Sequence, residues 1–168
     1  MRLRNPIFWV VAIAGLVLDQ LTKLWVVNTF ELTVPPETMP LWPGVFHFTY
    51  VTNTGAAFSL FSDNGEWLRW LSLLVSLALI VLGLAVSLHQ RWEQAGYGFI
   101  LSGALGNGID RFFNGEVVDF LDFRLIRFPI FNVADICINI GIVCLLIAAF
   151  TADGNGNGNG NGDKKRRS

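Results

Sequence analysis

The sequence predicts an all-α membrane core of four transmembrane helices, with a small extracytoplasmic β-sheet between the first and second helices. Three observations support this fold class. Of the 168 residues, 52% are hydrophobic and only 15% are charged, which is typical of membrane proteins. The apolar residues gather in four stretches of roughly 20 residues, the length that crosses a hydrocarbon core. A proline-rich segment, followed by aromatic and β-branched residues, separates the first two stretches.

The four predicted spans differ in their polar content. The first follows Arg2 and Arg4 like the h-region of a signal peptide, but no small-residue cleavage site follows it, so we expect it to be retained. The second has no charged residue from Trp70 to Leu88, and the third is rich in glycine, which suits close helix packing. The predicted spans cover residues 6–27, 67–88, 95–113 and 133–150.

Residues 29–66, between the first two spans, do not follow a helical pattern. Four prolines within residues 35–43 break any helix. Residues 45–52 then alternate aromatic or β-branched residues with others, as strands do. Residues 53–55 predict a turn, and residues 56–61 predict a second strand. We therefore expect this segment to form a small sheet at the membrane surface.

The last residues predict a separate tail, so we divide the chain into a membrane domain, 1–150, and a disordered cytoplasmic tail, 151–168. The Gly-Asn alternation of this tail has no residues that can build a core. Lys and Arg in the short loops and at both ends fall on one side if four spans alternate, so both termini should be cytoplasmic. The sheet then lies outside a bacterial plasma (inner) membrane. The net charge of −1 argues against a nucleic-acid partner.

The charged residues within the predicted spans all fall in the outer half of the bilayer. Asp19 lies near the outer end of the first span, Asp110 and Arg111 end the third, and Asp135 begins the fourth. A carboxylate in hydrocarbon costs roughly 2.5–3.5 kcal/mol on insertion scales, so such residues are rarely there without a function. We therefore expect a shared polar site near the outer leaflet.

The available side chains favour carboxylate chemistry at this site. His and Cys residues do not have the spacing of zinc ligands, so we expect neither a metal nor another cofactor. Lys23 follows Asp19 by four residues, the spacing of an intrahelical ion pair, and Asp110 and Arg111 can form another structural pair. Two neighbouring aspartates at low dielectric cannot both ionise cheaply, so one can activate water while the other donates a proton.

Spacing alone leaves open which two aspartates react. Asn132 and Asp135 match the spacing of a capping box, which is a structural role. Asp119 and Asp122 lie three residues apart in a short outer segment, where one of them can simply be solvated. An ion-coupled transporter or a structural membrane subunit would also carry such charges. The inner halves of the spans contain no continuous polar pathway, which argues against transport.

Five sequence blocks follow one another along nearly the whole chain up to Phe150: VLDQLTK at 17–23, NTGAAF at 53–58, GALGNGIDR at 103–111, VVDF at 117–120 and FNVAD at 131–135. In this order they resemble the lipoprotein signal peptidase (signal peptidase II) family of membrane aspartyl proteases. The resemblance implies that Asp119 and Asp135 form the catalytic dyad and that Asp122 is a surface residue. It implies a supporting or substrate-binding role for Asp19, Lys23, Asn53, Gly55, Asn107, Asp110, Arg111 and Asn132.

The same resemblance implies an endopeptidase that cleaves a diacylglyceryl-modified prolipoprotein on the N-terminal side of its lipidated cysteine. It also implies a β-cradle-like form for the external sheet. The expected partners are this substrate and membrane lipid, and a lateral opening for the substrate favours a monomer. The h-region of a signal peptide ends at the outer leaflet when its positive end stays inside, which is where the polar site is predicted.

Overall fold

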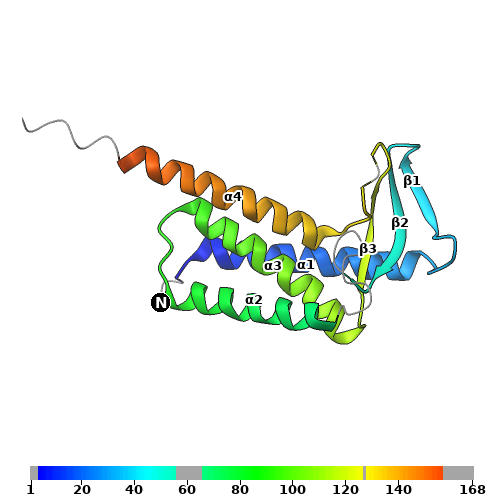
Figure 1. Ribbon diagram of the computed structural model, residues 1–168, viewed down its shortest axis with the longest axis horizontal. Coiled ribbons are helices and arrows are strands. Elements are labelled where there is room, and N and C mark those ends of the chain that lie inside the picture. Colours follow the sequence, from blue (N-terminus) through cyan, green and yellow to red (C-terminus); the bar gives the residue numbers. More distant parts are fainter. Residues whose placement is uncertain (1–3, 56–65, 127, 157–168) are drawn as a thin grey trace, which may run out of the picture.

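The computed structural model describes residues 4–55, 66–126 and 128–156. Four helices lie side by side, and a three-stranded antiparallel sheet covers one end of them (Figure 1). The helices are α1 (Pro6–Thr29), α2 (Glu66–Ala85), α3 (Arg91–Phe113) and α4 (Val133–Gly156), and the strands are β1 (Thr38–Trp42), β2 (Phe46–Asn53) and β3 (Val117–Phe123). All four predicted spans are therefore helices.

Three of the described helices are long and apolar enough to cross a membrane: α1, α2 from Trp67 to Ala85, and α4 from Val133 to Thr151. Their outward faces leave many large apolar side chains exposed, as lipid contact requires. The remaining helix, α3, is more polar and packs against the other three. Helix α4 continues to Gly156, past the predicted domain boundary at residue 150, and the tail beyond it lies outside the described residues.

Glycines bring the backbone of α3 close to α1 and α4. A side chain at Gly106 would overlap the Asp19 carboxylate of α1, and one at Gly103 would overlap the Ala134 carbonyl oxygen and the Ile138 side chain of α4. Small residues at such crossings allow close approach of helices in a membrane. The packing predicted for the glycine-rich span is therefore confirmed, and it brings the polar ends of three helices together.

The sheet has the order β1-β2-β3, and β2 confirms the strand predicted at residues 45–52. The prediction that the sheet lies wholly between the first two helices is wrong, because β3 comes from the link between α3 and α4. Nearly all of β3 is buried, so its sequence lacks the apolar–polar alternation of a half-buried strand. β1 contains Pro40, which an edge strand tolerates. The second predicted strand, at residues 56–61, lies outside the described residues.

An aromatic and aliphatic cluster joins the sheet to the helices. Val26 and Phe30, at the end of α1, pack with Tyr50 of β2 and with Val118 and Phe120 of β3. Burying these side chains provides the hydrophobic free energy that seats the sheet on the helix ends. This packing holds Asp119, between Val118 and Phe120, beside the start of α4.

Candidate active site

Asp119 and Asp135 line the same cavity, whose volume is about 420 Å³. Asp119 lies on β3 and is only 3% exposed, whereas Asp135 lies in the first turn of α4 and is half-buried. Four other predicted site residues also line this cavity: Asn53, Gly55, Asn107 and Arg111. The remaining four, Asp19, Lys23, Asp110 and Asn132, are buried beside it.

Two asparagine side chains connect the two carboxyl groups. The Asn132 Nδ2 donates to Asp119 Oδ1 at 2.7 Å and to Asn107 Oδ1 at 2.9 Å. The Asn107 Nδ2 in turn donates to Asp135 Oδ1 at 2.9 Å. The second Asp119 oxygen accepts a hydrogen bond from Asn53 Nδ2 at 3.1 Å. The two carboxyl groups therefore belong to one hydrogen-bonded chain.

The predicted capping box is confirmed at the start of α4. The Asn132 backbone N–H donates to Asp135 Oδ2 at 3.2 Å, and the Asp135 backbone N–H donates to Asn132 Oδ1 at 3.1 Å. Such reciprocal bonds satisfy backbone donors that the first helical turn leaves unpaired. Asp135 therefore caps α4 through Oδ2 and also lines the cavity, where its Oδ1 accepts the hydrogen bond from Asn107.

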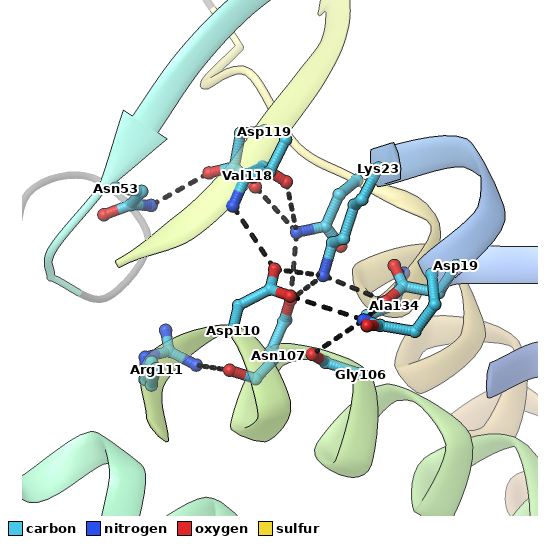
Figure 2. A network of polar contacts seen from close by, with 12 residues as sticks. Asp19, Lys23, Asn53, Gly106, Asn107, Asp110, Arg111, Val118, Asp119 and Ala134 are labelled. Carbon is cyan, nitrogen blue, oxygen red and sulfur yellow. Dashed lines mark hydrogen bonds and ion pairs between the residues drawn. The ribbon is translucent and has the colours of Figure 1, made fainter. Parts of the chain in front are cut away.

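Lys23 is the centre of a buried ionic cluster at the meeting point of α1 and α3 (Figure 2). Its Nζ lies 2.9 Å from Asp19 Oδ2 and 2.7 Å from Asp110 Oδ2, and it donates to Asn107 Oδ1 at 3.0 Å. These three acceptors match the three N–H groups of an ammonium. The predicted Asp19–Lys23 pair is confirmed.

The predicted pairing of Asp110 with Arg111 is wrong, because Asp110 points to Lys23. Arg111 instead donates to the carbonyl oxygens of Asn107, at 3.4 Å, and Gly55, at 3.3 Å. Consecutive residues of a helix project about 100° apart, so they seldom face one partner. Arg111 thereby lines the cavity, where its positive charge acts on Asp135 and Asp119.

The ionic cluster also holds the backbone next to each cavity aspartate. Asp19 Oδ1 accepts a hydrogen bond from the N–H of Ala134 at 2.9 Å. Asp110 Oδ2 accepts one from the N–H of Val118 at 3.3 Å. Val118 directly precedes Asp119 (Figure 2). Ala134 directly precedes Asp135 in the sequence. The Lys23 ammonium therefore orients the carboxylates of Asp19 and Asp110. These in turn hold the backbone next to Asp135 and Asp119.

The environment of Asp119 changes its acidity. Burial, followed by the negative charge of Asp135, raises the pKa of Asp119 from 3.8 to about 7, although hydrogen bonds from Asn53 and Asn132 act in the opposite direction. Burial penalises the charged form of a carboxyl group, and a second nearby carboxylate does the same. Near neutral pH, Asp119 is therefore available both with and without its proton.

Asp122 is buried, with an exposed fraction of 8%, so the prediction of a surface position is wrong. It accepts hydrogen bonds from Thr49 Oγ1 and from Arg124 Nε, each at 2.7 Å. Residues three apart on a strand face opposite sides, so Asp122 points away from the face that carries Asp119. Thr49 becomes a partner through the pairing of β3 with β2, whereas Arg124 lies two residues beyond Asp122, at the spacing of side chains on one face of a strand.

The structure also adds cavity residues that the sequence analysis missed. Asn139 lines the cavity from α4, four residues after Asp135, and helical spacing alone places it on the same face. An apolar wall comes from the segment before α4 and from isoleucines of α4; it includes Phe128, Ile130, Ile136 and Ile140. Among the described residues, no group of three or more His, Cys, Asp and Glu side chains is placed to hold a metal ion.

Comparison with known proteins gives a consistent result. The family model described as signal peptidase (SPase) II matches residues 11–151. The lipoprotein signal peptidase of Cyanothece sp. is 70% identical over 150 residues, covering 89% of this chain and 87% of the relative. That of Thermosynechococcus vestitus is 64% identical over 149 residues, covering 89% and 94%.

Two solved structures of bacterial membrane enzymes, both determined by the in meso method, have the same fold. The structure at 2.3 Å resolution superposes with a TM-score of 0.77 at 27% identity, covering 95% of this chain and 92% of the other. The structure at 1.9 Å has a TM-score of 0.72 at 30% identity, covering 83% and 90%. The protein is thus integral to a membrane, and with the family match over most of its length, the chain belongs to the signal peptidase II family.

Proposed function

We propose that this membrane peptidase removes the signal peptide from diacylglyceryl-modified prolipoproteins, and that Asp119 and Asp135 are its catalytic residues. Its family and its relatives, named lipoprotein signal peptidase, support the reaction. One observation carries the assignment of the dyad: both carboxyl groups line one cavity and belong to one chain of amide hydrogen bonds.

The proposed reaction uses one water molecule held between the two carboxyl groups. Asp135, as a carboxylate, takes a proton from the water while the water oxygen attacks the scissile carbonyl carbon. Asp119, in its protonated form, donates its proton to the carbonyl oxygen. The tetrahedral diol then collapses: Asp135 gives its proton to the leaving nitrogen as the C–N bond breaks, and Asp119 recovers a proton from a diol hydroxyl. Both residues end in their starting states.

The pKa of Asp119, about 7, supports its role as the proton donor. An effective general acid has a pKa near the working pH, because it must hold a proton and yet release it. Both Asp135 oxygens accept N–H hydrogen bonds, from Asn107 and from the Asn132 backbone. These hydrogen bonds fix the orientation of the Asp135 carboxyl group in the cavity, where we assign it the role of the base.

We place the protein in the bacterial inner membrane with four spans, both termini in the cytoplasm and the active site toward the outer leaflet. The start of α1 and the end of α4 lie at one end of the helices, with the sheet at the other (Figure 1). Helix α3 serves as the fourth span despite its charges, because Asp110 pairs with Lys23 inside the protein. In this orientation Arg4, just before α1, and Arg91, at the start of α3, face the cytoplasm.

The cavity has the two kinds of wall that a lipidated peptide needs. Carboxyl and amide groups of Asp119, Asp135 and Asn107 line one part, whereas Phe128 and Ile130 lie on an apolar part. Peptide groups need polar partners within a membrane, while acyl chains do not. This arrangement supports a monomeric enzyme whose substrate enters the cavity from the lipid phase. The acyl chains of the lipidated cysteine then stay in an apolar environment.

The proposed function is tested with purified protein and a synthetic prolipoprotein peptide, with and without the diacylglyceryl group. We expect cleavage of the lipidated peptide alone, at the bond on the N-terminal side of the modified cysteine, with mass spectrometry identifying both products. Equal cleavage of both peptides, or cleavage at another bond, would contradict the proposed specificity. A metal chelator should leave the rate unchanged.

A further inference from the structure

Asn139 is a polar side chain on an otherwise apolar part of the cavity wall. It is exposed on α4 between Ile136, 37% exposed, and Ile140, 41% exposed. Its Nδ2 donates to the carbonyl oxygen of Asp135 at 2.8 Å. Within the part of the chain that the structure describes, its Oδ1 accepts no hydrogen bond. The carboxamide therefore presents an available acceptor one helical turn from a proposed catalytic residue.

This acceptor needs a partner when the cavity is filled. Lipid offers no hydrogen-bond donor, so water must satisfy the Asn139 oxygen in the free enzyme. A substrate that displaces this water weakens its own binding unless it replaces the hydrogen bond. A ligand that suits this position therefore carries an N–H group.

The substrate has such a group only if its helix is unwound at this point. Within a helix, each backbone N–H already bonds the carbonyl four residues earlier. Attack on a peptide bond requires an accessible carbonyl, so the chain near the cleaved bond must leave the helical conformation, which frees its N–H and C=O groups. Ile130, also on the cavity wall, has a backbone N–H and C=O without hydrogen-bond partners among the described residues. The cavity thus offers further main-chain partners to an extended peptide.

The distance between Asp135 and Asn139 along α4 identifies which substrate residue lies beside Asn139. Asn139 lies four residues beyond Asp135, or about 6 Å along the helix axis. An extended peptide covers about 3.3 Å per residue, so this distance corresponds to about two residues. In the proposed orientation Asn139 lies deeper in the bilayer than Asp135, on the side from which the signal peptide arrives.

We infer that Asn139 is a substrate-positioning residue whose Oδ1 accepts a hydrogen bond from the backbone N–H of the second residue before the cleaved bond. This inference rests on the proposed function and orientation, and it adds the conformation in which the signal peptide is bound. Asn139 accepts this hydrogen bond from the substrate backbone and not from a side chain. The contact therefore favours an unwound peptide at this point, whatever its sequence.

Asn139→Leu tests the contact, because leucine has a similar size and suits a lipid-facing helix. We expect KM for the lipidated peptide to rise about tenfold with kcat unchanged, since the lost bond forms before and during the reaction. Asn139→Gln keeps a carboxamide and should recover part of this loss. Asn28→Leu is the matched control: Asn28 is exposed on α1, and its Nδ2 donates to the Leu24 carbonyl at 2.7 Å in the same i−4 pattern. Its KM should equal that of the wild type.

N-methylation of the substrate separates direct contact from a structural effect. A methyl group on the nitrogen of the second residue before the cleaved bond should raise the wild-type KM about tenfold and add nothing in Asn139→Leu, because the same bond is already lost. If the two effects multiply in full, or if Asn139→Leu has the wild-type KM, the inference is overturned. Such results in an active enzyme leave the proposed function intact, whereas wild-type rates for Asp119→Asn would overturn the dyad itself.

Discussion

Asp119 and Asp122 lie on the same buried strand, but the strand turns them to opposite faces and to opposite environments. Asp122 has a cation as partner, Arg124, and the hydroxyl of Thr49. Asp119 accepts its hydrogen bonds from the amides of Asn53 and Asn132, and it faces the charge of a second carboxylate. Burial, followed by the charge of Asp135, raises the pKa of Asp119 to about 7. The comparison distinguishes a carboxylate that holds the sheet together from one that can exchange a proton.

The largest expected effect that separates these two aspartates is on turnover. Asp119→Asn should lower the cleavage rate by at least about 10³-fold, because it removes the proposed general acid, and Asp135→Asn should do the same by removing the base. Cleavage of the lipidated peptide by purified protein in detergent measures this loss. Thermal unfolding of each variant, with a melting temperature near that of the wild type, is the control that it remains folded.

The next effect is on the pH dependence of turnover. With Asp119 as the acid, kcat/KM should fall about tenfold per pH unit above the pKa of Asp119, about 7, because only the protonated form donates. Rates measured from pH 5 to 9 test this. A profile that stays flat through pH 9, with chemistry limiting the rate, would contradict the assignment of the acid. Asp122→Asn should keep the same alkaline limb.

The same pKa also affects folding stability. Because the pKa of Asp119 is raised in the folded protein, its contribution to stability is fully present below the unfolded value of 3.8 and is lost as the pH rises through about 7. Asparagine resembles the protonated carboxyl group and does not titrate. The melting temperature of Asp119→Asn relative to wild type should therefore rise between pH 5 and pH 8. A constant difference would indicate that Asp119 does not titrate in this range.

The smallest expected effect on catalysis is that of Asp122→Asn. This change removes a charge-assisted hydrogen bond, so it should lower the free energy of unfolding by about 1–3 kcal/mol, which a shift in melting temperature detects. Turnover per folded molecule should stay within about twofold of wild type. A loss as large as that of Asp119→Asn would remove the distinction between the two faces of β3.

Sequence patterns predicted those features that depend on near neighbours in the chain. The helical spans, the strand at residues 45–52, the Asp19–Lys23 pair and the capping box of Asn132 and Asp135 all follow from spacing along one element. Strand β3 was not predicted, because a strand buried on both faces lacks the alternation of apolar and polar residues that marks a half-buried strand. The choice of Lys23 over Arg111 as partner of Asp110 depends on how α1 and α3 cross. The pairing of Asp119 with Asp135 was expected from family resemblance, since spacing left other aspartates equally available.

The position of Lys23 on the same helix as Asp19 has a consequence for biogenesis. Helix α1 carries its own counter-charge, because the two residues are four apart and pair within it. Helix α1 can therefore insert before α3 is synthesised without presenting an uncompensated charge to lipid. The later arrival of Asp110 adds a second carboxylate to an ammonium that is already in place. Assembly of the site then requires the docking of α3 against α1, but it does not require an unpaired charge to be buried.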